Sequence, residues 1–557
     1  MLIIISLSVI IFITLFLIIE KKIKLKRISN IKDEIKKSFG KKIEDQYFEI
    51  ELIERYWQIK SANIKEIDRI DDITWYDLEM DKVYCKINNC KSFAGEQILY
   101  SNLHETKVNE REYARLENKI NYFESESIER NEIWYIISRI GQNRDSYYLP
   151  DYIKNLEAFR ITNIEYFHFM RFLLLFSFIP AIANLNYTFL LFPFFVALIN
   201  IVIYSFQKSR YESYLNMLSS VLKILIASKR IVDQPVLKYN NIFKDLGYNL
   251  DKFRPLLIKI SKLQHRSPSN LSGDAMTLLE SMTFGITLWD IIQYDKIICQ
   301  LIGYQKELME LYIVIGEIDS AISIASFRKT LPFYCTPIFC KSNKIRAEDV
   351  YHPLVKNPIY NSIIIKNGCI ITGSNASGKS TFIKALAINA LLAQNISTCL
   401  AKNFIIPYSA IITSMAVRDE VSTAESYYIK EIKYIRRIIR ALNDKKLVFC
   451  IIDEILRGTN TEERIAASVA VLKYLYGKNC ITVVATHDIE LTEILGNYFE
   501  NYHFTEHISD KKILFEYKIH QGPAISRNAI KLLEYMEFPE EITQEAVRLL
   551  LSDNKII

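Results

Sequence analysis

The sequence predicts an α/β P-loop domain at the C-terminus, preceded by an all-α region that carries transmembrane helices. Residues 370–381 join an apolar run to the pattern Gly-x-x-x-x-Gly-Lys-Ser and then to a helical segment. From about residue 341 onward, short apolar runs alternate with helical patterns, which is typical of a layered α/β domain. Two segments, 2–19 and 172–206, contain no charged residue and are long enough for membrane helices.

The composition agrees with this division. A chain of 557 residues exceeds one ordinary core, so two or three domains are expected. Half of the residues are hydrophobic and the mean hydropathy is +0.06 although 24% are charged, which indicates soluble domains joined to membrane segments. The net charge of +6 permits a nucleic-acid or anionic-lipid partner without requiring one. The nine cysteines form no C-x-x-C pair, so we expect reduced thiols and no zinc site.

The first apolar segment, Leu2–Ile19, is just long enough to span a bilayer and predicts an N-terminal anchor within residues 1–27. It lacks a preceding basic segment and a small-x-small cleavage site, which favours a retained anchor over a removed signal peptide. The positive-inside rule places the basic residues that follow in the cytoplasm. These residues are Lys21, Lys22, Lys24, Lys26 and Arg27. The alternative is a buried core helix, and residues 28–65 are predicted as a helical juxtamembrane linker.

The second apolar segment, Phe172–Phe206, predicts a membrane hairpin. As one helix its 35 residues would extend about 52 Å, well beyond the roughly 30 Å of a bilayer core. Polar residues at 184–186 predict a turn, so we expect a transmembrane hairpin at about 168–206. The alternatives are apolar helices in a soluble core or at a dimer interface. Three spans would leave the C-terminal half on the cytoplasmic face of the cell inner or plasma membrane, where ATP is available.

A phosphate-binding loop is predicted where the apolar run meets the helical segment. Its glycines let backbone N–H groups turn toward phosphate oxygens, and the start of the helix faces the anion. Lys379 is expected to reach the β- and γ-phosphates of ATP, and Ser380 to offer its hydroxyl to Mg²⁺. The residues predicted to bind the nucleotide are Gly373, Ser374, Asn375, Ala376, Ser377, Gly378, Lys379, Ser380 and Thr381.

Two later apolar strands end in residues that suit ATP hydrolysis. One ends in Asp453 and Glu454, where the Asp is expected to hold Mg²⁺ and the Glu to orient and deprotonate the attacking water. The other ends at His487, which is placed to contact the γ-phosphate. Gln394, at the end of the helix after the loop, is a candidate contact to Mg²⁺ or water. The predicted catalytic residues are Glu454, His487 and Lys379, and the predicted metal ligands are Ser380 and Asp453.

Together these motifs resemble the MutS branch of the ABC-type ATPases. The segments that carry the resemblance are 371–381 (family pattern ITGPNxxGKST), 453–461 (DEIGRGTST), 485–492 (ATHYHELT), 426–432 (the STFxxEM signature) and 351–354 (the R-H-P opening). The resemblance is specific over about 346–550 and diffuse before it. It implies an ATPase domain at 346–557 and a helical core or lever domain at 66–345, interrupted by the membrane hairpin.

The resemblance also implies a head-to-tail homodimer that binds and hydrolyses ATP. Each site would combine the phosphate loop of one subunit with the signature segment of the other, so Ser426 would approach the γ-phosphate in trans. Tyr517 falls where the family places an aromatic residue or a histidine against adenine. DNA binding for mismatch repair is the usual task of the family.

The sequence departs from the family in ways that bear on this task. Tyr427 stands at the Thr position of the signature, and Ser374 and Ala376 replace a Pro and a larger residue in the loop. The Phe-x-Glu wedge that enters the minor groove in mismatch-recognising members occurs only at 504–506 and 538–540, inside the ATPase region. A membrane hairpin interrupts the helical region and leaves no obvious room for a DNA clamp. Mismatch recognition therefore does not follow from the sequence.

Two functional hypotheses stay open. The first is a membrane-anchored ATPase whose nucleotide cycle moves the helical region. The second keeps a DNA role, with phosphate contacts from a basic cluster that is otherwise a solvated helix face. This cluster comprises Lys252, Arg254, Lys259, Lys262 and Arg266. A transporter motor is disfavoured by the absence of an L-S-G-G-Q signature, and a non-catalytic scaffold by the complete set of site residues.

Overall fold

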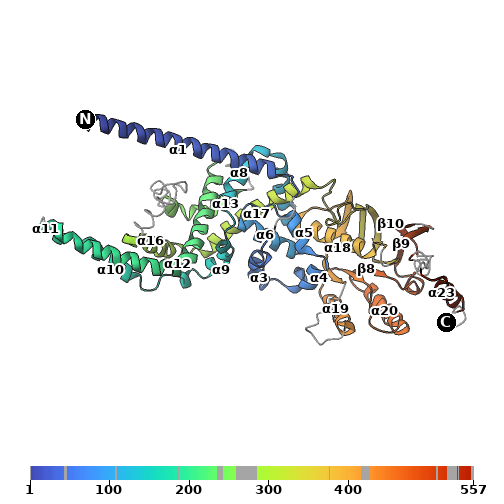
Figure 1. The fold of residues 1–557 in the computed structure, drawn as a ribbon. Coiled ribbons are helices and arrows are strands. Elements are labelled where there is room, and N and C mark those ends of the chain that lie inside the picture. The colour runs from blue at the N-terminus through green and yellow to red at the C-terminus, as the bar shows by residue number, and fades with distance from the viewer. Residues whose placement is uncertain are drawn as a thin grey trace.

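The chain folds in the order that the sequence predicts, with a helical region first and an α/β region second (Figure 1). The computed structural model describes residues 2–42, 47–106, 110–184, 187–234, 243–258, 285–374, 377–415, 427–509, 512–523, 536 and 538–552. Within this part of the chain, the first strand begins at residue 338.

The α-helices of the first region cover most of its length. They are α1 (Leu2–Ser38), α2 (Ile50–Ile53), α3 (Arg55–Ser61), α4 (Asp72–Asp77), α5 (Met80–Ile87), α6 (Phe93–His104), α7 (Glu110–Ser125), α8 (Ser127–Ser138), α9 (Leu149–Lys154), α10 (Ile164–Phe176), α11 (Ile179–Asn184), α12 (Leu191–Val232), α13 (Lys244–Asp251), α16 (Trp289–Leu301) and α17 (Gln305–Thr330).

Helices α6 and α17 form the centre of the helical region. Every residue of α6 is buried, and a Cβ built on Gly316 of α17 would lie 2.4 Å from Ile98 of α6, so only glycine permits this approach. Asp319 of α17 accepts hydrogen bonds from the Ser92 N–H (2.8 Å) and the Trp134 indole N–H (3.1 Å). Because the carboxylate is fully buried, these donors replace the water that it loses on folding.

The later part of the N-terminal helix α1 (Leu2–Ser38) packs against the helical region. Helix α1 continues through the basic flank, and Lys32 Nζ lies 2.6 Å from Glu132 Oε1 of α8. Ile53 and Trp57, in α2 and α3, are also buried. Much of the predicted juxtamembrane linker, residues 28–65, is therefore packed into the helical region, because it supplies apolar side chains to the core.

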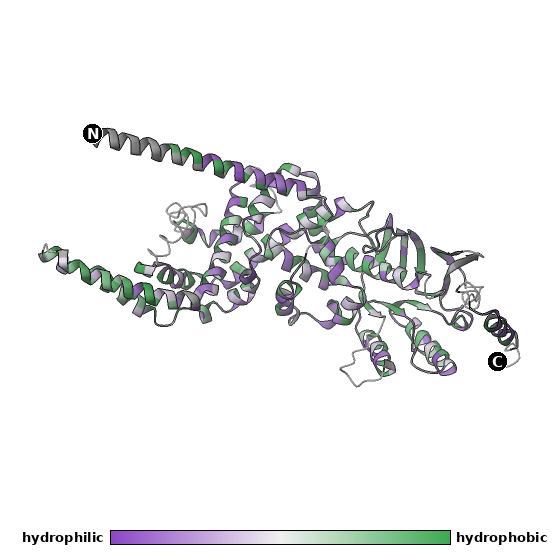
Figure 2. Cartoon of the chain, in the orientation of Figure 1, coloured by the Kyte–Doolittle hydropathy of each residue, from purple (hydrophilic) through white to green (hydrophobic). Residues whose placement is uncertain are grey.

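A helical hairpin of α10, α11 and α12 extends in the same direction as α1, away from the α/β region (Figures 1 and 2). Segments Leu156–Ala183 and Thr188–Gln207 are long and apolar enough to cross a membrane. Many of their large apolar side chains face outward, with Phe192 64% and Phe206 76% exposed, although Phe167 and Leu174 are buried. The hairpin is therefore not the core of a soluble domain within this chain. Residues 185–186 of the predicted turn lie outside the described residues.

The α/β region contains two sheets, a four-stranded one with the order β1-β5-β2-β3 and a six-stranded one with the order β10-β9-β4-β8-β7-β6. The strands are β1 (Ile338–Cys340), β2 (Lys344–Val350), β3 (Asn361–Lys366), β4 (Gly368–Thr372), β5 (Asn403–Pro407), β6 (Ala410–Ser414), β7 (Val448–Asp453), β8 (Cys480–Thr486), β9 (Glu500–Ser509) and β10 (Lys512–Gln521). The helices are α18 (Lys379–Ile396), α19 (Tyr427–Ala441), α20 (Thr461–Tyr476), α21 (Glu490–Ile494) and α23 (Glu540–Ser552).

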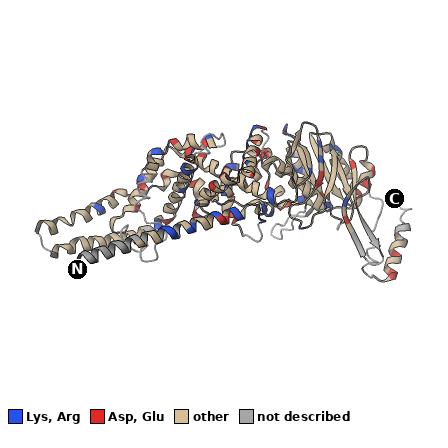
Figure 3. Ribbon diagram, turned by 90° about the horizontal axis from the view of Figure 1, so that it is seen from above, with Lys and Arg blue, Asp and Glu red and all other residues tan. Residues whose placement is uncertain are grey.

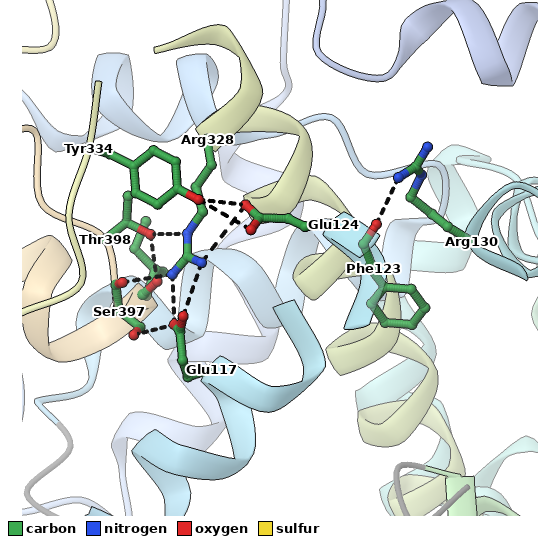
Figure 4. A network of polar contacts seen from close by, with 9 residues as sticks. Glu117, Phe123, Glu124, Arg130, Arg328, Tyr334, Ser397 and Thr398 are labelled. Atoms are coloured by element: carbon green, nitrogen blue, oxygen red, sulfur yellow. Dashed lines mark hydrogen bonds and ion pairs between the residues drawn. The ribbon is translucent and has the colours of Figure 1, made fainter. Parts of the chain in front are cut away.

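A buried ionic network joins the two regions at the far end of α18 (Figure 4). Arg328, at the end of α17, donates to Glu117 of α7 (2.7 Å), to Thr398 Oγ1 (3.0 Å) and to the Ser397 carbonyl (2.7 Å). Glu124 of α7 accepts a hydrogen bond from the Tyr334 hydroxyl at 3.1 Å. The end of the helix that follows the phosphate loop is thereby tied to two helices of the first region.

Candidate functional site

The order of strands in the larger sheet brings the predicted site residues to one edge. Strands β4, β8 and β7 are neighbours and run parallel, so their carboxyl ends lie side by side. The phosphate loop follows β4, Asp453 ends β7, and His487 follows β8. Ligands of open parallel sheets bind at this carboxyl edge, where loops replace the ladder hydrogen bonds.

The backbone of the loop has the shape that anion binding needs. Gly373 has a φ of 145° and Gly378 a φ of 98°, a region that residues with a side chain rarely adopt. A Cβ on Gly373 would lie 2.9 Å from Ser377 Oγ, and one on Gly378 would lie 3.1 Å from the Tyr517 ring. Helix α18 begins directly after Gly378, so its N-terminus faces the loop. Asn375 and Ala376 lie outside the described residues.

Lys379 is the buried cation of the site, with only 3% of its surface exposed. Its Nζ donates to the carbonyl oxygens of Gly373 (2.6 Å) and Ser374 (2.8 Å) and lies 3.5 Å from His487 Nδ1. The ammonium group is therefore held at the mouth of the loop by neutral acceptors. A phosphate oxygen is a stronger acceptor for it, because the bond would then join opposite charges.

Glu454 follows Asp453 at the end of β7 and is oriented by two basic side chains. Its Oε1 is 2.7 Å from His487 Nε2, and its Oε2 is 2.7 Å from Arg457 Nε. Burial raises the pKa of Glu454, but the contacts with His487 and Arg457 outweigh it, so the pKa lies below its usual value. Glu454 also has a φ of 62°, a left-handed conformation that is uncommon for a residue with a side chain.

The structure fits a bound Mg²⁺ at Asp453. This residue ends β7, and its Oδ1 is buried without a hydrogen-bond partner among the described residues. A buried, unpaired carboxylate oxygen is costly, and a cation or its water shell would compensate it. Ser380 is the second residue of α18, which follows β4, and β4 is separated from β7 by β8 alone. Asp453 and Ser380 are therefore the residues that would hold the metal.

Two further contacts fix the loops around the site. Arg464 of α20 holds Asp488 with two bonds, Nε to Oδ2 at 3.0 Å and the nearer terminal nitrogen to Oδ1 at 2.7 Å. This pair positions the residue that follows His487. Glu431 of α19 accepts a hydrogen bond from the Gly458 N–H at 3.3 Å, so α19 packs on the loop after β7. Ser426, the predicted signature contact, lies outside the described residues.

Tyr517 lines a cavity that opens from the phosphate loop. The cavity measures about 330 Å³, and its wall includes Gly378, Ser380 and Thr381 as well as Tyr517. The Tyr517 carbonyl accepts a hydrogen bond from Asn361 Nδ2 at 2.9 Å, which ties β10 to β3. Residues between 350 and 361, which include the R-H-P-like segment, also line this cavity. The sequence alone assigned no site role to them.

Gln394 does not join the site. It lies 15 residues beyond Lys379 on the same helix, which is about 22 Å at the usual rise. Its Oε1 accepts a hydrogen bond from the Ser409 N–H (2.9 Å), and its Nε2 donates to the Ala390 carbonyl (3.3 Å). The expectation that Gln394 touches Mg²⁺ or water is therefore corrected. The helix carries it away from the phosphate loop, where it joins α18 to the start of β6.

Comparisons with known proteins agree with this geometry. Residues 369–552 match the family model of MutS domain V. The chain is 32% identical to human MutS protein homolog 4 over 323 residues, which cover 53% of this chain and 33% of the relative. It is 28% identical to the DNA mismatch repair protein MutS of Thermotoga maritima over 266 residues, which cover 46% and 33%.

A third relative, the DNA mismatch repair protein MutS of Fervidobacterium nodosum, is 31% identical over 269 residues, which cover 46% of this chain and 32% of the relative. The chain thus spans about a third of the length of the curated relatives that it matches. The C-terminal region carries a MutS domain V, and the region before it is helical. The part of the chain that these comparisons cover is thus similar to proteins of the MutS family.

Proposed function

We propose that this protein is a Mg²⁺-dependent ATPase that is anchored in a membrane and acts as a homodimer. The observation that carries the proposal is the row of contacts from Lys379 through His487 to Glu454, beside the unpaired Asp453 oxygen. These groups supply a cation for the phosphates, a carboxylate for the attacking water and a metal ligand at one edge of the sheet.

The residues of this chain have distinct tasks in such a reaction. The loop N–H groups and Lys379 would bind the β- and γ-phosphates, while Ser380 and Asp453 would hold Mg²⁺, which neutralises phosphate charge when bound. Glu454 would accept the proton of the attacking water, and His487 would keep its carboxylate in position. The 330 Å³ cavity beside Tyr517 has a volume suited to the nucleoside.

The dimeric part of the proposal rests on the resemblance of the signature segment and on the place of α19. This helix starts at Tyr427, directly after Ser426, and packs on the loop after β7. A second subunit would bring its Ser426 to the γ-phosphate of the first. A site that needs two subunits would show a specific activity that rises with protein concentration.

The proposal of a membrane anchor rests on the helical hairpin of α10, α11 and α12 and on the apolar start of α1. From residue 166 to 207 the hairpin contains no acidic residue, and most of its phenylalanines are exposed, whereas Phe167 is buried. Its ribbon is mostly hydrophobic (Figure 2). Basic residues follow the apolar start of α1 on the side of the α/β region (Figure 3). By the positive-inside rule these features support insertion into the inner or plasma membrane with the ATPase domain in the cytoplasm.

The network at Arg328 supports a coupling between the nucleotide site and the helical region. Helix α18 begins at the phosphate loop and ends beside Arg328, which also binds Glu117 of α7 (Figure 4). A second connection lies at the β6 edge of the six-stranded sheet. There Arg437 of α19 lies 2.6 Å from Asp71, the residue that caps α4. A movement of α18 or α19 during the ATP cycle would therefore be passed to the first region.

Phosphate release by the full-length protein in detergent tests the central claim. Steady-state turnover that requires Mg²⁺ and is absent from a Lys379→Ala preparation would support it. A well-folded preparation that neither binds nor hydrolyses ATP would overturn it.

A second candidate function is DNA binding, which the names of the bacterial relatives favour. In this chain the described members of the basic cluster are paired with acids: Lys252 with Glu307, and Arg254 with Asp251 at 2.9 Å. Their positive charge is thus compensated, so these two residues offer little to DNA phosphates. Lys259, Lys262 and Arg266 lie outside the described residues. Binding of matched and mismatched duplexes by the solubilised protein over a salt series decides, because phosphate contacts are strongest at low salt. No binding at low salt would remove this function.

A further inference from the structure

A large groove lies between the helical region and the α/β domain, apart from the phosphate loop. Its volume is about 1080 Å³, at the upper end of the range for small-molecule sites, roughly 300–1,000 Å³. One wall is the end of α17 with Leu331 and Pro332, and the other is the loop from Tyr351 to Tyr360. Lys42 and Lys86 complete the lining from the helical side.

The charge of the groove is of one sign. Lys42, Lys86 and Lys356 line it, and no Asp or Glu does so among the described residues. The Lys86 ammonium donates to the Pro353 carbonyl at 2.8 Å, which leaves its charge uncompensated. Partial burial and the nearby Lys42 both lower the pKa of Lys86, so the two lysines repel each other. An anion between them would remove this repulsion.

A buried histidine adds a neutral donor to the same wall. His352 is 8% exposed, and burial, then Lys384, lowers its pKa to about 4, so the ring is neutral at pH 7. Its Nδ1 accepts a hydrogen bond from the Leu354 N–H at 3.1 Å. The proton of the neutral ring is therefore on Nε2, which has no hydrogen-bond partner within the part of the chain that is described.

The rest of the lining is apolar, which limits the kind of anion. The partly exposed apolar side chains of the lining are Leu331, Leu354 and Tyr360. A small inorganic ion would leave these surfaces in water, whereas a ligand with a ring or an alkyl body would cover them. The lining therefore suits a molecule with a phosphate at one end and an apolar body at the other.

We propose that this groove binds an organic phosphate with an aromatic or apolar body, at a site separate from the nucleotide pocket. The two cavities adjoin at the loop 351–359, whose residues line both. They differ in their other walls, because Gly378, Ser380 and Thr381 line only the smaller cavity and the three lysines line only the larger one. A molecule in the groove would contact the outer side of the loop that closes the nucleotide pocket.

Pyridoxal 5′-phosphate is a suitable probe for full-length protein in detergent, because it joins a phosphate to an aromatic ring. Its aldehyde carbon condenses with a lysine Nζ and releases water, and borohydride then reduces the C=N bond to a stable secondary amine. Peptide mass spectrometry gives the extent of labelling at each lysine. Pyridoxal without the phosphate is the matched control, because it reports the intrinsic reactivity of the same amine.

We expect Lys86 to prefer the phosphorylated probe over pyridoxal by about tenfold, as one charge-assisted contact would give. Lys82, on the same helix with 70% of its side chain exposed, gives the baseline preference, because the free hydroxyl of pyridoxal closes on its own aldehyde and lowers its reactivity toward any amine. The tenfold preference expected at Lys86 is measured relative to this baseline. Replacement of Lys42 and Lys356 by Met should remove the preference at Lys86, measured as the ratio of labelling by the two probes, because a change in the pKa of the amine affects both probes alike. Equal preference at Lys86 and Lys82 would overturn the proposal.

A competition with ATP and Mg²⁺ separates this site from the nucleotide site. Labelling at Lys379 should fall when ATP is added, whereas labelling at Lys86 should persist. Loss of both would show that the groove belongs to the nucleotide site and would overturn the proposal. If ATP failed to protect Lys379 while Lys86 kept its preference, the ATPase assignment would fail and the groove would stand.

Discussion

Glu454 Oε1 lies 2.7 Å from His487 Nε2, and these two atoms join the ends of β7 and β8 at the mouth of the phosphate loop. Neither residue is near the other in sequence, and neither alone identifies a reaction. Together with Lys379, 3.5 Å from the same imidazole, they form a chain of polar contacts around the place where a γ-phosphate would lie.

Replacing Glu454 by Gln should stop hydrolysis and spare ATP binding. The amide keeps the shape of the carboxylate but cannot accept a proton, so turnover should fall by about 10²- to 10⁴-fold. Phosphate release and nucleotide binding, measured on the same preparation, check this. Glu462→Gln, on the exposed start of α20, is the control and should keep wild-type turnover. Unchanged turnover in Glu454→Gln would contradict the catalytic role.

Lys379→Ala should weaken ATP binding, because its ammonium is the cation held at the loop mouth. Loss of a charged hydrogen bond is worth about 1.5–3 kcal/mol, so affinity should fall by about 10- to 150-fold. Equilibrium binding of a fluorescent ATP analogue measures it. Lys445→Ala, an exposed lysine before β7, should bind like the wild type. Equal affinity in both variants would rule out the loop as the phosphate site.

Arg328→Met should destabilise the protein strongly, since it leaves Glu117 and Glu124 without their buried cation. Breaking a buried pair from one side typically costs about 3–5 kcal/mol. Arg144→Met is the matched control, because its partner Glu49 is 49% exposed and such surface pairs contribute about 0–1 kcal/mol. Denaturant unfolding of the solubilised proteins compares the two, and similar losses would mean that the network in Figure 4 adds little stability.

Stability should fall as the pH rises from about 4.5 to about 7, and Glu96 should account for part of the fall. Burial raises the pKa of Glu96 from 4.5 to about 7, so the folded protein prefers its protonated form. The contribution is complete below pH 4.5 and is lost as the pH rises through about 7. Glu96→Gln should flatten the dependence of Tm on pH over this window. A mutant curve parallel to that of the wild type would assign the slope to other groups.

Alkaline carbonate extraction should leave the protein in the membrane fraction. The exposed phenylalanines of α10 to α12 and the apolar start of α1 would stay in the bilayer after ionic contacts are removed. Replacing Phe192 and Phe195 by Asp should weaken retention, because each buried carboxylate is costly in lipid. Complete release of the wild-type protein would contradict the membrane anchor.

Local patterns were sufficient for much of the fold and the site. The strands at 448–453 and 480–486 and the helix after the loop appear where the apolar runs and the glycine spacing predict them. These features depend on neighbouring residues, because apolar runs, turns and helix starts are set by the local sequence. The residue at 394 shows the limit of such patterns, since its distance from the loop depends on the direction of α18.

By itself, the sequence determined the phosphate loop, the strand-end carboxylates, the two apolar segments at 2–19 and 172–206 and the resemblance to MutS. The tertiary structure alone decided that His487 holds Glu454, that Tyr517 packs against Gly378, that Arg328 joins the two regions, and that three lysines share a groove. The physical reason is that these contacts join residues that are distant in the chain. They follow from the sheet order β4-β8-β7 and from the packing of α17 and α18. Neither can be predicted from the local sequence alone.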